Sequence, residues 1–272
     1  MSGGERKDHR QRVLRVEAIV LRHSDWGEAD RMLGLFTLEM GKIRALAKGV
    51  RKIRSRKAGH LEPFTRVSLL LAKGRDILLI TQADTVEAYL SLREDMAGIT
   101  YASYVVELLD RFTYEEGENR PLYRLLADTL RRLAQEQSGT ESSDRELAIR
   151  YYEMRLLDLV GFRPQLFRCL SCGEEIKPED QFFSAQEGGI LCSKCGSGFP
   201  GAQPISMMAL KYLRHFQRSS FTEARRARLT PEINREIEQI IQYYMTYLLE
   251  RGLNTPAFLR RVRRDLKDLT PG

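Results

Sequence analysis

The sequence predicts an α+β fold in which an N-terminal five-stranded OB-fold barrel is followed by a helical domain with an inserted four-cysteine zinc module. Three observations predict it. Apolar residues alternate with period 2 over the first ninety residues, they recur at helical spacing after Leu90, and two C-x2-C pairs lie between Cys169 and Cys195. The expected domains are the barrel at 1–90, the helical domain at 91–164 and 204–272, and the cysteine module at 165–203.

Short strands account for the barrel. The Val-, Ile- and Leu-rich run from Val13 alternates apolar and polar residues, and turn signals at Met40-Gly41 and Lys73–Asp76 separate later runs. Five short strands in so short a segment are typical of a small closed barrel, and the OB-fold is favoured because it has five strands and commonly binds single-stranded nucleic acid. The expected strands cover 13–23, 31–39, 42–48, 64–73 and 77–88.

Helices are expected after the barrel. Apolar stripes spaced by about 3.6 residues, Pro121 in a first turn and a capping-box pattern from Ser143 to Glu146 mark their positions. Gly161 fits a left-handed helix stop. We interpret the apolar stripes as core and assign them no chemistry. The expected helices pass through 102–112 and 122–133, run from 143 to 160, and begin at Thr230-Pro231 and Thr255-Pro256.

Length and composition fit an ordinary globular protein. A chain of 272 residues is long enough for one large domain or two to three small ones. The N-terminus lacks the apolar core of a signal peptide, and no apolar run approaches the roughly 18 residues of a membrane span. We therefore expect a cytoplasmic protein with reduced thiols and no membrane partner, so that its cysteines are read as metal ligands before disulfides.

The segment Gly41–Gly59 carries the basic character of the chain. It contains no Asp or Glu and eight basic residues: Lys42, Arg44, Lys48, Arg51, Lys52, Arg54, Arg56 and Lys57. The whole chain has 44 Lys and Arg against 37 Asp and Glu, so without these eight cations 36 basic residues would face 37 acidic ones. Ile43, Ala45 and Ala47 alternate with Lys42, Arg44, Leu46 and Lys48, which predicts a strand with its cations on one face. Residues 50–58 are expected to form a mobile loop or a short helical turn.

A concentrated cationic patch is the electrostatic footprint of a polyanionic partner, so these eight cations are the candidate DNA-binding residues. The alternative is a solvated loop that keeps the protein soluble. Trp26, Phe36 and Phe64 are candidates for stacking bases on the barrel, although an aromatic residue in a small barrel is more often part of the core.

Two cysteine pairs predict a metal centre. Cys169, Cys172, Cys192 and Cys195 have the spacing C-x2-C-x19-C-x2-C, which lets four thiolates surround one ion. Such a closed site would hold one structural Zn²⁺ per chain and leave no open position for catalysis. Gly173 and Gly196 follow the second cysteine of each pair, where we expect them to supply unusual backbone angles. The alternatives are redox dithiols or a degenerate site without metal.

Other candidate chemistry is weaker. Asp25, Glu28 and Asp30 surround Trp26-Gly27 and are the acids that a metal-dependent nuclease would need, but a polar loop is the simpler interpretation. The sequence contains no G-x-x-x-x-G-K-[ST] phosphate loop and no recognisable Ser/His/Asp or Cys/His motif. We therefore expect a binding protein and not an enzyme.

Two stretches carry a resemblance to a known family. The segments GEADRMLGLFTLEMGKIRALAKGVRK and GFRPQLFRCLSCG, the latter followed by LCSKC, resemble bacterial RecO, a family of DNA repair and recombination mediators. The likeness runs from about Val13 to Arg264. It implies an OB-fold, a helical domain and a zinc module. The family's basic DNA-binding positions would fall on Lys42 and Arg44, and its zinc ligands on the cysteines, which some relatives lack.

The resemblance also implies a function. It predicts binding of single- and double-stranded DNA, annealing of complementary strands, and cooperation with RecR and single-strand binding protein in loading RecA, in the bacterial cytoplasm and at the nucleoid during repair. The residues themselves leave two rivals open: an RNA- or ribosome-associated zinc-ribbon protein, and a metal nuclease using the acids near Trp26.

Overall fold

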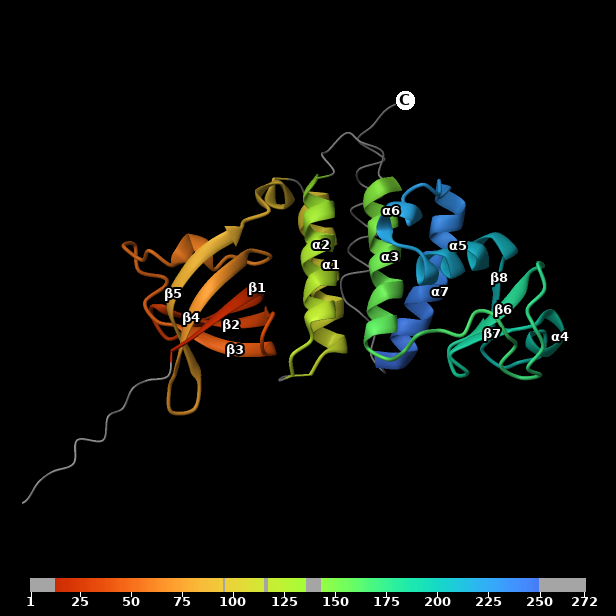
Figure 1. Ribbon diagram of the computed structural model, residues 1–272, viewed down its shortest axis with the longest axis horizontal. Helices are drawn as coiled ribbons and strands as arrows, with labels where there is room; N and C mark the ends of the chain where they lie inside the picture. The colour runs from red at the N-terminus through yellow and green to blue at the C-terminus, as the bar shows by residue number, and fades with distance from the viewer. Residues whose placement is uncertain (1–12, 95, 115–116, 136–142, 250–272) are drawn as a thin grey trace, which may run out of the picture. The chain divides into compact units, whose positions relative to one another are not determined.

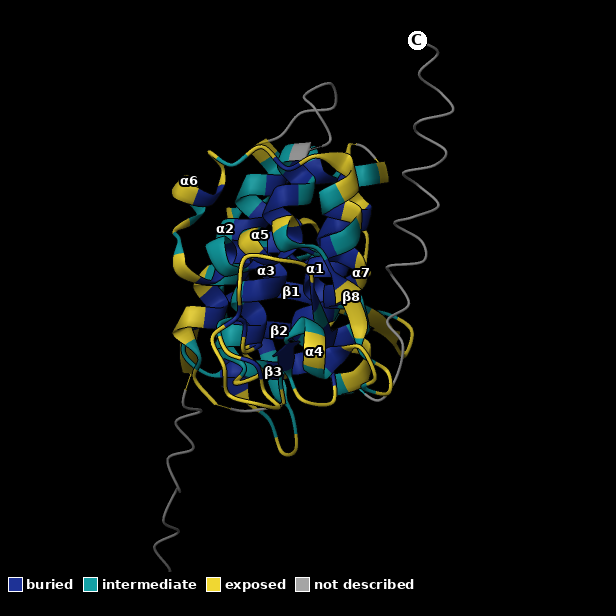
Figure 2. Ribbon diagram, turned by 90° about the vertical axis from the view of Figure 1, so that its right-hand side faces the viewer, coloured by how far each residue is buried: buried dark blue, intermediate teal, exposed yellow. Residues whose placement is uncertain are grey.

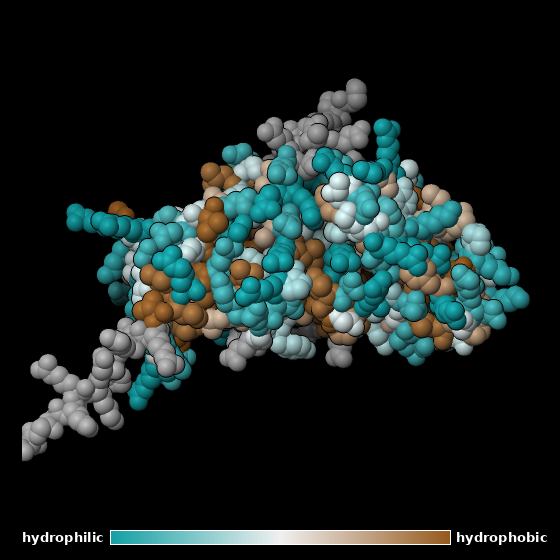
Figure 3. Space-filling model, in the orientation of Figure 1, coloured by the Kyte–Doolittle hydropathy of each residue, from teal (hydrophilic) through white to brown (hydrophobic). Residues whose placement is uncertain are grey.

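The computed structural model describes residues 13–94, 96–114, 117–135 and 143–249, and it divides into two compact units that we describe separately. The first comprises the chain up to Ala88 and the segment Glu115–Tyr123, and the second comprises Tyr89–Tyr114 and the chain from Arg124. The helix expected after Thr255-Pro256 lies outside the described residues. Hydrophilic residues cover most of the visible face, and hydrophobic residues gather on part of the barrel (Figure 3).

The first unit is a closed five-stranded barrel, as the sequence predicts (Figure 1). Its strands are β1 (Val13–Trp26), β2 (Asp30–Thr37), β3 (Gly41–Ala47), β4 (Arg66–Lys73) and β5 (Leu78–Glu87). They follow one another around the barrel in the order β1-β2-β3-β5-β4, and β4 closes onto β1. β3 and β5 pair in parallel and the other neighbours are antiparallel, which is an OB-like arrangement.

Period-2 alternation decides which side of each strand faces the barrel core. On β3, Ile43, Ala45 and Ala47 are buried in the core with residues such as Leu33 and Leu69. Successive side chains on a strand point to opposite faces, so Lys42 and Arg44 lie on the outer face of β3 together with Leu46, which is itself buried, and Lys48 follows directly after the strand. The predicted strand with cations on one face is confirmed.

A tight turn joins β2 to β3. The Thr37 hydroxyl donates to the carbonyl of Gly41 at 3.0 Å and accepts from the N–H of Met40 at 2.9 Å. Gly41 has φ +68°, and a Cβ there would lie 1.9 Å from the carbonyl oxygen of Gly117. Glycine is therefore required at the first residue of the basic strand, because both the backbone angle and the space exclude a side chain.

The second unit is built from helices around a buried central helix. They are α1 (Met96–Phe112), the part of α2 (Arg120–Gln135) from Arg124, α3 (Ser143–Leu159), α5 (Met207–Arg218), α6 (Phe221–Ala224) and α7 (Pro231–Leu249), preceded by the short helix η2 (Leu90–Arg93). α3 packs against α1, α5, α6 and α7, and Figure 2 shows it largely in the colour of buried residues. No helix in the part of the chain that the structure describes has the length and apolar character needed to cross a membrane.

Charged groups lie inside this helical core. Arg150 and Glu153 are fully buried on α3 and form an ion pair at 3.2 Å. The Tyr104 hydroxyl donates to Glu153, and burial together with the Glu153 charge raises the pKa of Tyr104 well above its usual value. A buried charge is tolerated where it is paired and hydrogen-bonded, so these three residues act as one unit.

The cysteine module is a small three-stranded sheet with one helical turn. It contains β6 (Gln181–Ser184), β7 (Gly189–Leu191), α4 (Ser193–Gly196) and β8 (Gln203–Ile205), with the strand order β7-β6-β8. Phe182 pairs with Leu191 across the β6–β7 hairpin. That hairpin carries the second cysteine pair back toward the first.

Candidate nucleic-acid interface and metal centre

On the outer face of the barrel, a glycine of β2 lies between an arginine of β3 and an arginine of β1. Arg44 lies opposite Gly34 of β2, and Gly34 lies opposite Arg22 of β1. A Cβ at Gly34 would lie 3.2 Å from the Cγ of Arg22, so the arginine side chain passes over the glycine. Sequence reasoning missed Arg22, because the only signal for it is a strand register that the linear pattern does not contain.

The segment after β3 presents the other candidate cations. Arg51, Lys52, Arg54 and Arg56 are exposed, while Val50 at the start of the segment is buried in the barrel core. Backbone hydrogen bonds from Lys52 to Gly49 at 3.2 Å and from Ser55 to Lys52 at 2.9 Å fold it into turns. The short helix η1 (Ala58–His60) ends it. The exposed cations therefore project from a loop whose base is anchored.

Lys57 has a different role from the other cations. Its Nζ donates to the carbonyl of Lys48 at 3.1 Å and to that of Ile80 at 3.0 Å. Burial lowers the pKa of Lys57, and the Asp30 carboxylate partly offsets that effect. Lys57 thus ties the basic loop to β5 and to the residue that directly follows β3.

Two acidic residues near Trp26, Asp25 and Asp30, contact the same loop. Asp25 pairs with Arg51 at 3.2 Å and with Arg31 at 3.6 Å. Asp30 accepts from the N–H of Gly49 at 2.7 Å. Within the described ranges, the one group of three or more potential metal ligands is the set of four cysteines, so these acids form no metal cluster there.

The three candidate stacking aromatics divide into two kinds. Phe36 and Phe64 are buried, at 1% and 8% exposure, which confirms the core interpretation for both. Trp26, at the end of β1, is 55% exposed. Trp26 is therefore the one of the three that offers a flat face to a base.

The four cysteine sulfurs form a compact cluster. All four Sγ atoms lie within 4.8 Å of one another, and those of Cys172 and Cys192 are 3.9 Å apart. A tetrahedral thiolate site with metal–sulfur bonds of about 2.3 Å has sulfur–sulfur edges of roughly 3.8 Å. The residues Cys169, Cys172, Cys192 and Cys195 therefore fit a single metal ion.

Backbone groups around the cluster favour a thiolate. The N–H of Cys192 donates to the Sγ of Cys169 at 3.3 Å. Burial raises the pKa of the Cys169 thiol, but hydrogen bonds from the backbone of Cys172, Cys192 and Ser171 outweigh it and lower that pKa to about 6. Metal ligation requires a deprotonated sulfur, so the lowered pKa of Cys169 favours the form that binds metal.

The two glycines beside the cysteines act differently. Gly173 has φ +76° and supplies the unusual backbone angle that the sequence predicts. For Gly196 that prediction is wrong, because its φ is not positive. A Cβ at Gly196 would lie 2.4 Å from the Cβ of Phe182, so this glycine is needed for close packing of α4 on β6.

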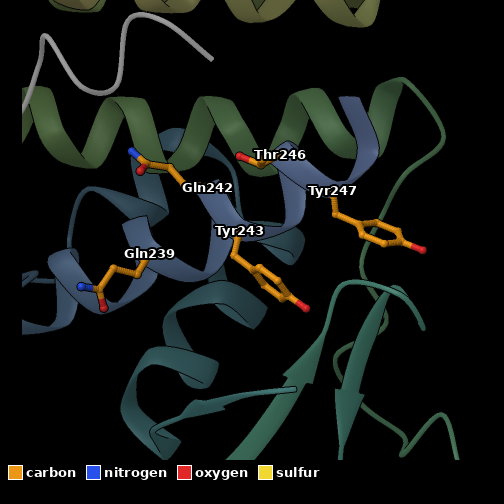
Figure 4. Close-up of a pocket in the computed structure, with 5 residues that line it drawn as sticks. All are labelled: Gln239, Gln242, Tyr243, Thr246 and Tyr247. Carbon is orange, nitrogen blue, oxygen red and sulfur yellow. The ribbon is translucent and has the colours of Figure 1, made fainter. Parts of the chain in front are cut away.

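A separate shallow hollow lies on α7 (Figure 4). It measures about 460 Å³ and is lined by Gln239, Gln242, Tyr243, Thr246 and Tyr247. The two tyrosine rings project to the same side of the helix, and the Tyr243 hydroxyl donates to the carbonyl of Gly201 at 2.8 Å. Its lining offers amide, hydroxyl and aromatic groups.

Fold and site define a class of protein: an OB-like barrel with a basic outer face, joined to a helical region that carries a four-cysteine metal-type module. The family models "Recombination protein O N terminal" and "Recombination protein O C terminal" match residues 12–89 and 93–257. Together they span most of the chain. The chain belongs to the RecO family of DNA repair proteins.

Named relatives agree. The DNA repair protein RecO of Roseiflexus sp. (strain RS-1) is 39% identical over 96% of this chain and 90% of its own length. The RecO proteins of Pelotomaculum thermopropionicum and Dehalococcoides mccartyi (strain 195) are 36% and 34% identical, over 92% and 88% of this chain and 94% and 91% of their own lengths. Family membership supports a role in DNA repair and recombination.

Proposed function

We propose that this chain is a non-enzymatic recombination mediator that binds single- and double-stranded DNA and anneals complementary strands. The observation that carries the proposal is the row of cations on the outer face of β3, continued by the exposed basic loop. Phosphate contacts of this kind supply affinity without reading sequence.

The mechanism is electrostatic. Two complementary strands repel each other through their phosphates, and a basic barrel face neutralises part of that charge on both. Bringing both strands to one surface raises their local concentration, and base pairing then supplies the specificity. On this account annealing requires neither a nucleotide nor a catalytic metal.

The proposed partners follow from the family. We propose that the chain works with RecR and with single-strand binding protein to load RecA, in the bacterial cytoplasm at the nucleoid.

The four cysteines would hold one structural Zn²⁺, whose closed coordination stiffens the module. The functional parts would be the barrel at 1–90, the helical domain at 91–164 and 204–272, and the module at 165–203.

A fluorescence annealing assay tests the proposal. Complementary oligonucleotides are mixed with the full-length protein, bare or coated with the cognate single-strand binding protein, with and without ATP and EDTA. We expect faster pairing under every one of these conditions. A strict requirement for ATP, or cleavage of the strands in place of pairing, would contradict the proposal.

A further inference from the structure

A second hollow lies in the helical unit, where the segment after α3 meets the end of α5. It measures about 310 Å³, and its lining combines charged, amide and aromatic groups: Arg163, Pro164, Gln165, Phe167, Gln217 and Arg218. All of these residues belong to the second unit, as do the four cysteines. Neither the basic stretch nor the metal cluster contributes to it.

The arginines around this hollow outnumber the carboxylates that pair with them. Arg155 and Arg163 share one partner, Asp158, at 3.2 and 3.5 Å. Arg218 contacts no carboxylate among the described residues. Burial and the charge of Arg218 lower the pKa of the neighbouring Arg214, and Glu175 offsets this only in part. An anion placed here would relieve the repulsion between these arginines.

One arginine is stacked on an aromatic ring. The guanidinium carbon of Arg218 lies 3.8 Å from the centroid of Phe167, and that of Arg214 lies 5.0 Å from it. Arg218 is exposed, so its planar group remains accessible to solvent. Unstacked bases of single-stranded nucleic acid stack on aromatic rings and on arginine planes of this kind.

A buried acceptor completes the lining. The Gln217 side chain is only 4% exposed, and its Nε2 donates to the carbonyl of Pro164 at 2.8 Å. Its Oε1 is buried and accepts no hydrogen bond from any described residue. Buried acceptors are normally paired, and a ligand N–H donor would pair with this oxygen if the Gln217 amide turned toward the hollow.

We propose that this hollow binds one nucleotide of a single-stranded nucleic acid. Arg163 and Arg218 would hold the phosphate, the base would stack on the Arg218 plane, and a base N–H would donate to the Gln217 oxygen once that amide turns toward the hollow. A nucleotide carries the anion, the flat face and the donor together, and every common base has an N–H donor, so the site would not select sequence. This inference rests on the proposed function and adds a second DNA contact to that of the barrel.

The test uses the full-length chain and oligonucleotides that carry 5-iodouracil for photocrosslinking. Arg163→Glu combined with Arg218→Glu should abolish crosslinks to the peptide that contains Phe167 and weaken binding about tenfold. Losing two phosphate contacts should also flatten the slope of log K against log salt by roughly 1.4. Arg235→Glu, an exposed arginine on α7, serves as the control and should keep the Phe167 crosslink. Thermal melting confirms that each variant is folded.

The outcomes separate this inference from the proposed function. If the wild type binds and anneals DNA while the double variant keeps both the crosslink and the affinity, the nucleotide site is refuted and the mediator role stands. If the double variant loses binding only to a fluorescent acidic peptide, the site takes a peptide and the inference is equally wrong. If the wild type binds no DNA, both fail.

Discussion

Arg22 of β1 lies across Gly34 of β2, so that a Cβ at position 34 would be 3.2 Å from its Cγ. Gly34 in turn is paired with Arg44, which places an arginine on either side of one glycine on the outer barrel face. Because Gly34 has no side chain, Arg22 of β1 and Arg44 of β3 can lie on the same surface.

Replacing this glycine should disturb DNA binding without a change of charge. We expect Gly34→Val to displace the Arg22 side chain and to flatten the salt dependence of oligonucleotide binding by about 0.7, the contribution of one phosphate contact. Arg22→Ala should have the same effect, and combining the two changes should add nothing. Fluorescence anisotropy across a salt series measures this. Additive effects would show that the glycine acts independently of Arg22.

Lys57 should matter for the loop more than for direct contact with DNA. Lys57→Met removes the two hydrogen bonds to the carbonyls of Lys48 and Ile80, and we expect a loss of about 1 kcal/mol in the free energy of unfolding. Faster proteolysis within the loop should accompany it. Lys52→Met, which removes an exposed charge from the same loop, is the matched control and should leave urea denaturation unchanged. Equal stability of the two variants would refute the tethering role.

Protonation of Glu17 in acid should lower the stability of the barrel. Its carboxylate accepts from Arg66 at 2.7 Å and from Tyr123 at 2.9 Å. Burial raises the pKa of Glu17, but these hydrogen bonds and the Arg66 charge outweigh it and hold the pKa below its ordinary value. A lowered pKa in the folded state gives stability that is present above the unfolded value and is lost as pH falls through the folded value.

Glu17→Gln tests that linkage. At pH 7 the variant should be less stable than the wild type by about 1 kcal/mol, because the pair is partly exposed. The difference should shrink as pH falls below the ordinary Glu pKa of about 4.3 and through the lowered pKa of the folded state, where the wild-type carboxylate becomes protonated. Urea denaturation at several pH values measures it. A constant difference across the range would mean that the charge of Glu17 contributes nothing.

The cysteine cluster should carry one zinc ion. Metal binding in such sites contributes on the order of 10 kcal/mol, so Cys192→Ser should lower the melting temperature markedly. Ser193→Ala, beside it, should leave the metal content intact. Elemental analysis of purified protein that finds clearly less than one zinc per chain, with no stabilisation on adding zinc, would contradict the assignment.

The barrel could be predicted because its signals are local. Alternation places all five strands within a few residues of their observed bounds, although β1 runs on to Trp26, beyond the expected end at 23. The helix α5 lies outside the expected helices, although the sequence contains signals for it. Ser206 caps its first turn by accepting from the N–H of Ala209 at 3.1 Å, and Leu210, Leu213 and Phe216 form its buried stripe.

The features that depend on register and tertiary packing could not be read from the linear pattern. The approach of Arg22 to Gly34 requires the pairing of two strands, and the tie from Lys57 to Ile80 joins residues 23 positions apart. The cysteine cluster was predictable because each pair is a local turn. The unpaired oxygen of Gln217 follows from how α5 packs on the chain after α3.

The salt dependence of DNA binding by a Lys42→Glu, Arg44→Glu double variant tests the central claim most directly. If the wild type neutralises about four phosphates, its log K should fall with log salt at a slope of roughly −3 for single strands. The account predicts that the double variant flattens this slope and loses annealing along with affinity. A Lys73→Glu, Arg75→Glu control, at exposed positions at the end of β4 and in the turn that follows it, should retain both. A double variant with unchanged slope, affinity and annealing would contradict the account.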